Sequence, residues 1–261
     1  ALGGQDLSSV EKYDPITNTW SVGVALPSEV NHGTAIAVGG KIYSIGGRNA
    51  SDQTINQVLC FDPSTNQWSA KANMLTARHG PKLVLFEGRI WAIGGGSDGN
   101  TNKKVESYDP TTNSWQNEAS LTSERHWPVA WVANGRIYCG GGQYLNSTEY
   151  YDPVTKHWLS GGNFTENKYA ADAVVLNDHV YVVAGKRSSS VYSNKVYAAD
   201  LSASVAGVYD LYRKDGNASA GTPLVQAEVP DGSVTASKIA SNTITTSQLN
   251  EQILKYLKPE I

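Results

Sequence analysis

Residues 90–115 read IWAIGGGSDGNTNKKVESYDPTTNSW, and this stretch is the unit that the chain repeats. In it a hydrophobic strand ends at glycines, a polar loop follows, and a second strand ends in Tyr-Asp-Pro before a tight turn delivers a tryptophan. The same order recurs in residues 42–68 and 137–158, and part of it opens the chain as LGG and KYDPITNTW. The copies are 48, 47 and 43 residues apart, and such periods are typical of propellers and solenoids. The spacing is measured between Trp20, Trp68, Trp115 and Trp158.

Each full copy predicts four strands. The first is a short apolar run, and a Gly-containing or Asn-Asp turn joins it to the strand that ends at the glycines. Such dipeptides are strong signals for a β-hairpin. The third strand ends in the Tyr-Asp-Pro segment, and the fourth carries the tryptophan. The predicted first strands are 34–38, 82–86, 129–133 and 172–176.

The Asp-Pro-x-Thr-Asn-x-Trp connection has a mechanical interpretation. The aspartate can accept backbone N–H bonds across the turn, the proline presets φ, and the asparagine tolerates the left-handed conformation. We therefore interpret the repeated aspartates as structural and not catalytic, and we expect the tryptophans to pack between adjacent sheets. These aspartates are Asp14, Asp62, Asp109 and Asp152.

Composition excludes several classes of protein. The 261 residues are 40% hydrophobic and 17% charged, which suits one large all-β domain. A formal charge of −3 offers no basic field, so we expect no nucleic-acid partner. No apolar run approaches the length of a membrane span. Cys60 and Cys139 lie in predicted strands with unequal surroundings, and we interpret them as small buried hydrophobic residues.

Gly-Gly, then Tyr, then Trp seven residues further on, resembles the kelch repeat, which folds as one four-stranded propeller blade. The resemblance covers residues 1 to about 212 and implies an all-β, kelch-type β-propeller with four whole blades and one partial blade. The last copy departs from the pattern, since Ala184 replaces a glycine and no tryptophan follows Tyr197, but we count it as a blade that ends with a strand at 207–212. The predicted propeller is 1–214, with blades at roughly 1–24, 25–72, 73–120, 121–163 and 164–214.

How the ring closes has two interpretations. Alignment of the glycines places Ala1 in the middle of a strand, so we expect the chain to be part of a longer protein. A missing N-terminal portion is the simpler account. The alternative is a five-bladed ring in which residues 223–229 supply the absent inner strand.

Residues 215–261 are predicted to be a linker, a Ser/Thr-rich tail and a short helix. GSVTASKIAS and NTITTSQLNE echo each other and resemble repeats of trimeric fibre and surface proteins. Leu249, Ile253, Leu254 and Leu257 follow one helical stripe. A helix this short needs a packing partner, so the tail is a candidate for homo-oligomer formation or for packing on the propeller.

In kelch-like propellers the glycine-pair loops and the connections between blades share one face around the central channel, and partners usually bind there. The corresponding loops of this chain are polar and differ from one another, as binding loops on a rigid scaffold do. At the start of the inner strands the sequence reads Asn31-His32, Arg78-His79, Arg125-His126 and Lys168-Tyr169, the first within one residue of register. These basic residues would suit an anionic ligand or acidic peptide, or they bond backbone carbonyls within each blade. The candidate ligand-binding residues are Arg48, His32, Arg78, His79, Arg125, His126, Trp127, Tyr144, Lys168, Tyr169 and Arg187.

Trp127 is the most individual residue of this face. The matching positions carry Gly80 and Ala170, so a large ring replaces a small residue near the channel mouth. It could stack on a sugar or a Pro-rich segment, or it could fill the channel where its neighbours are small. Trp131, which matches Ile36, Val84 and Val174, is expected in the core.

Motifs for catalysis, metal or cofactor binding do not stand out, and we expect no cofactor. The sequence favours a non-catalytic module that binds a protein or glycan, within a larger protein that is extracellular or on the cell surface; a cytoplasmic location is the alternative. The extracellular placement rests on the Ser/Thr/Asn-rich composition and on Asn-x-Ser/Thr matches at Asn49, Asn146, Asn163 and Asn217. The alternative function is a kelch-fold enzyme, resembling either copper radical oxidases or sialic acid mutarotases. The mutarotases use Arg and acidic residues at the channel, and Arg78, Glu124 and Arg125 resemble these only loosely.

Overall fold

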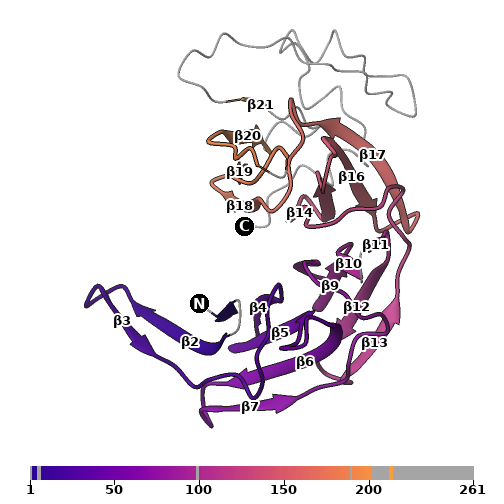
Figure 1. Ribbon diagram of the computed structural model, residues 1–261. Coiled ribbons are helices and arrows are strands. Elements are labelled where there is room, and N and C mark those ends of the chain that lie inside the picture. Colours follow the sequence, from indigo (N-terminus) through magenta and orange to yellow (C-terminus); the bar gives the residue numbers. More distant parts are fainter. Residues whose placement is uncertain (1, 5–6, 98–99, 189, 202–211, 214–261) are drawn as a thin grey trace, which may run out of the picture.

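The computed structural model describes residues 2–4, 7–97, 100–188, 190–201 and 212–213. Its regular elements in these residues are β-strands, which form one three-stranded sheet and four four-stranded sheets, with a small separate hairpin of β10 and β11. The sheets follow one another around an arc, and the first strand of each full sheet lies innermost (Figure 1). The inner strands β4, β8, β14 and β18 contact one another in that order. This is the arrangement of blades in a β-propeller.

The five sheets are named here as the first to fifth blade. The first blade is β1 to β3, the second β4 to β7, the third β8, β9, β12 and β13, the fourth β14 to β17, and the fifth β18 to β21. The strands are β1 (Leu2–Gly4), β2 (Leu7–Asp14), β3 (Thr19–Val22), β4 (Thr34–Val38), β5 (Lys41–Arg48), β6 (Thr54–Asp62), β7 (Gln67–Ala70), β8 (Lys82–Phe86), β9 (Arg89–Ile93), β10 (Gly96–Ser97), β11 (Asn100–Thr101), β12 (Val105–Asp109), β13 (Ser114–Asn117), β14 (Val129–Ala133), β15 (Arg136–Gly140), β16 (Ser147–Asp152), β17 (His157–Asn163), β18 (Asp172–Leu176), β19 (His179–Val183), β20 (Val196–Asp200) and β21 (Tyr212–Arg213).

The four predicted inner strands are confirmed, since β4, β8, β14 and β18 have the predicted bounds. The turn after each inner strand places two consecutive residues at positive φ, between 48° and 73°. That geometry is the type I′ hairpin turn, which matches the twist of the flanking strands. The pairs are Gly39 and Gly40, Glu87 and Gly88, Asn134 and Gly135, and Asn177 and Asp178.

The Asp-Pro turns also have the predicted mechanics. Oδ1 of Asp109 accepts the backbone N–H of Thr111 at 2.8 Å and of Thr112 at 3.4 Å. The hydroxyl of Thr111 also donates to this oxygen, and these bonds lower the pKa of the Asp109 carboxyl below its usual value. Asn113 then takes a φ of 52° and returns the chain to β13. Asn18, Asn66 and Lys156 adopt the same conformation in the other copies, with φ of 54°, 55° and 57°.

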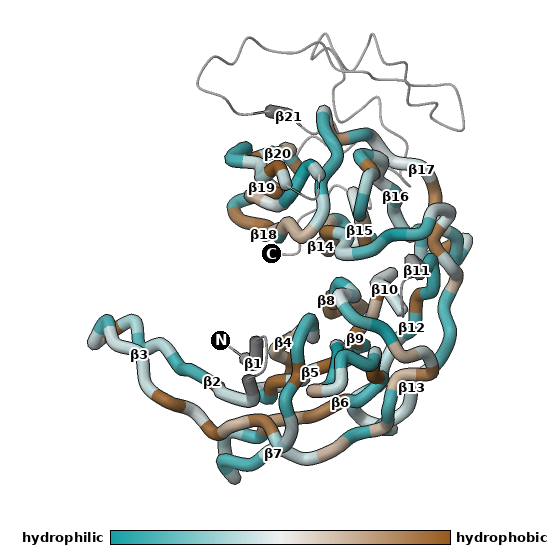
Figure 2. Tube along the Cα trace, in the orientation of Figure 1, coloured by the Kyte–Doolittle hydropathy of each residue, from teal (hydrophilic) through white to brown (hydrophobic). Residues whose placement is uncertain are grey.

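The apolar core lies between neighbouring blades. One cluster joins Phe86 and Trp91 of the third blade to Cys139 and Trp158 of the fourth, and another joins Trp131 of the fourth blade to Val182 of the fifth. The core position of Trp131 and the burial of Cys60 and Cys139 are therefore confirmed. The innermost strands β4 and β18 are coloured as hydrophobic in Figure 2.

The outer-strand tryptophans connect each blade to the one before it. The indole N–H of Trp68, Trp115 and Trp158 donates to the carbonyl of Val24, Ala72 and Ala119 at 3.0, 2.8 and 2.9 Å. Trp20 occupies the same position in the first blade, where it is 62% exposed. The predicted packing between sheets therefore holds for three of the four tryptophans.

Several predictions lie outside the described residues. They are the linker and Ser/Thr-rich tail at 215–261, the helical stripe that includes Leu249 and Ile253, and the closing strand at 223–229. Of the last strand predicted at 207–212, only Tyr212 is described; it lies in β21 and pairs with Ala198 of β20.

The position of the tryptophans generates a test of the fold. Trp158→Ala should lower the free energy of unfolding by about 3–5 kcal/mol, because the ring is 5% exposed between two blades and its loss leaves a cavity. Urea unfolding measures this change. The matched control is Trp20→Ala, which should cost less than about 1 kcal/mol. Equal losses for both variants would contradict the packing between blades.

Candidate functional site

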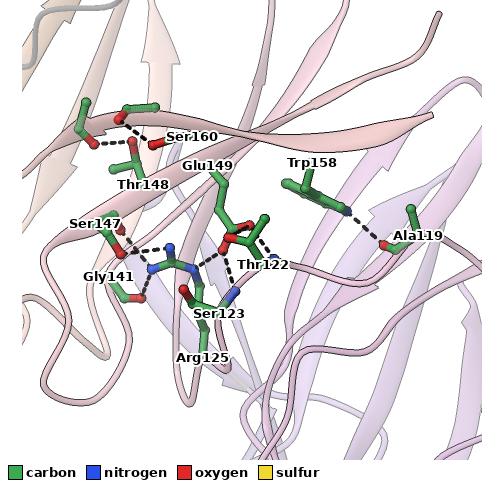
Figure 3. A network of polar contacts seen from close by, with 12 residues as sticks. Ala119, Thr122, Ser123, Arg125, Gly141, Ser147, Thr148, Glu149, Trp158 and Ser160 are labelled. Atoms are coloured by element: carbon green, nitrogen blue, oxygen red, sulfur yellow. Dashed lines mark hydrogen bonds and ion pairs between the residues drawn. The ribbon is translucent and has the colours of Figure 1, made fainter. Parts of the chain in front are cut away.

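The connection into the fourth blade is held by a buried arginine. Nε of Arg125 donates to Glu149 Oε1 at 2.8 Å, and both side chains are 1% exposed. Nη1 of Arg125 donates to the carbonyls of Gly141 and Ser147 at 2.5 and 2.8 Å. Glu149 in turn accepts the N–H and hydroxyl of Thr122 at 2.6 and 2.7 Å (Figure 3). One ion pair thus joins the incoming connection, the glycine loop and strand β16.

A buried basic residue with a glutamate partner also occurs in the neighbouring third and fifth blades. In the third blade Arg78 pairs with Glu106 and donates to the carbonyls of Gly94 and Lys104 at 3.2 and 2.9 Å. In the fifth blade Lys168 donates to the carbonyl of Ala184 at 2.9 Å.

The acid of the fifth blade, Glu166, comes from the incoming connection and not from the third strand. Burial would raise the pKa of Glu166, but hydrogen bonds from Ser193, Lys195 and Tyr197 lower it to about 2. Glu166 also lies 3.6 Å from Nζ of Lys168. The second blade has no such pair, because Leu26, Val30 and Leu59 form an apolar cluster there.

The three basic side chains of the ring are buried and already have partners. Arg78, Arg125 and Lys168 are 0%, 1% and 0% exposed. Their donors are directed at carboxylates and carbonyls of their own blades. The structure therefore favours the alternative interpretation, in which these residues bond backbone carbonyls and hold the blades together.

The structure also resolves the register of the inner ring. Isolated bridges pair Asn31 with Arg48, His79 with Gly96 and Tyr169 with Lys186, so Asn31 matches His79 and not Arg78. The prediction allowed an error of one residue at His32, and the structure shows that shift. His32 matches Gly80, Trp127 and Ala170, and all four have positive φ, at 54°, 58°, 49° and 50°.

Trp127 is the outlier of this ring. An aromatic residue at positive φ is uncommon and strained, and such strain concentrates at functional sites. Its indole lies over Gly80 of the third blade, where an added Cβ would clash with Cδ1 and Nε1 of Trp127. The indole stacks on His126 with ring centroids 4.1 Å apart and on Tyr169 at 6.3 Å. Gly80 and Trp127 are therefore complementary, and the ring is fixed by neighbours from two other blades.

A pocket of about 380 Å³ opens in front of Trp127. Its titratable lining consists of His32, Lys82 and Asp172, and burial followed by the charge of Arg48 lowers the pKa of His32. Lys82 of β8 and Asp172 of β18 form an ion pair between the third and fifth blades. The other lining residues are Gly33, Thr34, Gly80, Pro81, Trp127, Pro128, Ala170, Ala171, Val183 and Ala184.

The remaining predicted residues divide into three groups: buried, ion-paired and exposed. His79 and Tyr169 are each 4% exposed, so they support the pocket wall. Arg48 is paired with Asp52 at 2.8 Å, and Arg187 with Glu166 at 2.9 Å. Tyr144 is 61% exposed with a φ of 66°, on the loop between β15 and β16.

Sequence reasoning missed the Lys82 and Asp172 pair and the two prolines of the pocket lining, Pro81 and Pro128. The sequence did identify Trp127, because a large residue stands there where the matching position of the third blade carries Gly80. A second signal was Leu59, which stands where Glu106 and Glu149 stand in later blades and so marks the blade without an ion pair.

The fold and the repeated Gly-Gly, Tyr and Trp positions define a kelch-repeat β-propeller. The chain belongs to the family described as the KLHDC2/KLHL20/DRC7 kelch-repeats domain, whose model matches residues 3–142.

Individual relatives match shorter segments. Kelch-like protein 35 of Homo sapiens is 38% identical over 64 residues, which are 23% of this chain and 11% of that protein. Kelch-like protein terF of Aspergillus terreus is 44% identical over 45 residues, 17% of this chain and 10% of that protein. The match thus spans about a tenth of the length of these curated relatives. The structure of YjhT has the same fold, with a TM-score of 0.61 and 17% identity over 75% of this chain and 68% of that one.

Among the described residues there is no helix with the length and apolar character that a membrane crossing requires. Within the same residues, no three His, Cys, Asp or Glu side chains are already arranged around one point as metal ligands.

The contact between Gly80 and Trp127 can be tested by a double-mutant cycle. Gly80→Ala should cost about 1–2 kcal/mol from its left-handed conformation and about 1–3 kcal/mol more from overpacking against the indole. In a Trp127→Ala background only the first cost should remain. Urea unfolding of the four proteins measures both, and equal costs in the two backgrounds would show that the indole of Trp127 does not contact residue 80.

Proposed function

We propose that this chain is a non-catalytic recognition module that binds a protein partner at the channel mouth. The observation that carries the proposal is Trp127, a half-buried ring held at positive φ over Gly80 at the edge of a pocket of about 380 Å³. A rigid aromatic side chain beside a pocket of this size is a typical anchor point for a partner side chain.

The chemistry of the pocket favours binding over catalysis. Lys82 and Asp172 neutralise each other across the pocket, which leaves no strongly charged group aimed at a ligand among the described lining residues. The arginines Arg78 and Arg125, which a mutarotase-like mechanism would need at the channel, are buried in the blades. Cys60 and Cys139 are likewise buried.

The shape of the lining indicates what the partner presents. Glycine, alanine and proline form most of the wall, so the space accepts an apolar or ring-shaped side chain against the indole face. The exposed Tyr144 and the polar loops around it supply the outer contacts. This combination suits a turn or extended segment of a protein partner. An extracellular or cell-surface location remains part of the proposal and rests on the composition of the chain.

The proposal predicts the effect of removing the anchor. A screen of the full chain against peptide and glycan arrays supplies the ligand, and titration then compares variants. Trp127→Ala should weaken the identified ligand at least tenfold, or about 1.4 kcal/mol, while the melting temperature shows that the protein stays folded.

The matched control lies on the opposite face of the propeller. Thr112 and Ser114 are exposed and bond each other at 2.8 Å in the Asp-Pro turn, so their double change to Ala should leave affinity unchanged. Loss of binding in this control, with normal binding by a folded Trp127→Ala variant, would show that recognition lies on the face of the Asp-Pro turns and would contradict the proposal. If the arrays yield only glycan ligands, the proposal of a protein partner is wrong, although the site at Trp127 can still be correct.

A further inference from the structure

The fifth blade exposes apolar side chains on its far face, which is the side turned away from the fourth blade. Its other side packs on the fourth blade through a cluster that includes Val180 and Val182. Strand pairing matches three residues of the far face to residues of the third blade: Val174 to Val84, Leu176 to Phe86 and Val196 to Val105. The three are 52%, 57% and 39% exposed, whereas their counterparts are 7%, 5% and 1% exposed. The far face therefore has the residues of an internal face of the arc but is open to solvent.

The third blade shows what covers such a face. Its residues at these positions form one cluster with Tyr151 and Trp158 of the fourth blade. Trp91 belongs to the same cluster, and its ring centroid lies 4.9 Å from that of Tyr151, which in turn lies 5.7 Å from that of Trp158. In the fifth blade, Tyr181 stands at the position of Trp91. The counterpart of the far face is thus a Tyr-Trp pair on the two outer strands of another blade.

A Tyr-Trp pair of this kind is exposed on the first blade. Tyr13 pairs with Trp20 across β2 and β3, as Tyr151 pairs with Trp158 across β16 and β17. Tyr13 and Trp20 are 43% and 62% exposed, whereas Tyr151 and Trp158 are each 5% exposed. The ring centroids of the exposed pair are 5.2 Å apart, close to the 5.7 Å of the buried pair. The first blade therefore presents the aromatic counterpart of the far face, with its rings already placed as in an internal interface.

These two faces lie at the two ends of the described arc. Figure 1 shows that the arc is open, so the two faces do not meet within one chain. Clustered apolar side chains on a surface mark a site of interaction. The interface between the third and fourth blades shows that faces of these two kinds pack against each other.

We propose that the far face of the fifth blade binds Tyr13 and Trp20 of the first blade in a second copy of this chain. The contact repeats the interface between the third and fourth blades, with Leu176 and Tyr181 against the two rings. Because the two faces differ, each copy offers one of each, and the association is head-to-tail. Such a contact continues from copy to copy, so dimers grow into rings or filaments. It is separate from the recognition proposed for Trp127, and neither depends on the other.

Sedimentation velocity of the full chain over a series of concentrations tests this proposal. The wild type should form dimers and larger species in increasing amounts as the concentration rises. Trp20→Asp and Leu176→Asp each place a carboxylate in one of the two faces, and each should weaken association at least tenfold. Because both side chains are more than half exposed, the melting temperature should stay near that of the wild type.

A mixture of the two variants distinguishes head-to-tail association from association of like faces. Trp20→Asp keeps an intact fifth blade and Leu176→Asp keeps an intact first blade, so one unaltered contact can form between them. The mixture should therefore form dimers with one copy of each variant and no larger species. The protein that carries both changes should stay monomeric.

The matched control is Val154→Asp, which adds the same charge at an 88% exposed side chain in the Asp-Pro turn of the fourth blade. It should associate like the wild type. Should Leu176→Asp fail to fold, Val174→Asp tests the same face. A wild type that is monomeric at every concentration would overturn the proposal, as would association that neither variant weakens. Normal association by Trp20→Asp, with loss of association by Leu176→Asp, would also overturn it, because the fifth blade would then bind a second fifth blade.

Discussion

The ion pair between Arg125 and Glu149 joins two charges that are almost fully removed from water. Each is stable there only because the other is present and because backbone groups satisfy the remaining donors and acceptors. Those backbone groups belong to the glycine loop after β15 and to the connection from the third blade. The geometry of the channel mouth therefore depends on a contact that lies entirely beneath it.

Variation among the blades shows how this constraint leaves the surface free to differ. The second blade replaces the pair with Val30 and Leu59, and the fifth uses Lys168 with Glu166. Two residues after the buried position the chain lines the pocket at the mouth, where the side chains range from glycine to tryptophan. The buried position that holds the blade and the variable position at the channel mouth are close in sequence. A repeated blade can therefore keep its structure and still present a different side chain at the mouth.

Local features of the fold were predictable from the sequence. The I′ turns and the Asp-Pro turns are specified by residues within a few positions, so the strand bounds followed. Partners distant in the chain were not predictable: Glu106 is 28 residues from Arg78, and Asp172 is 90 residues from Lys82. The register of His32 was uncertain by one residue because Val30 stands where the other blades carry the basic residue by which they can be aligned. Trp127 was identified because the matching residues of the third and fifth blades are small. Its contact with Gly80 was not predictable, because it depends on how the third and fourth blades lie beside each other.

A double-mutant cycle on the buried pair tests the central claim most directly. Urea unfolding would compare Arg125→Met, Glu149→Leu and the double variant with the wild type. If the pair holds the blade as described, each single change leaves a buried charge uncompensated and costs about 3–5 kcal/mol. The double variant should then lose at least about 2 kcal/mol less than the sum of the single losses. Additive losses, or single changes below about 0.5 kcal/mol, would contradict a structural role for the buried pair.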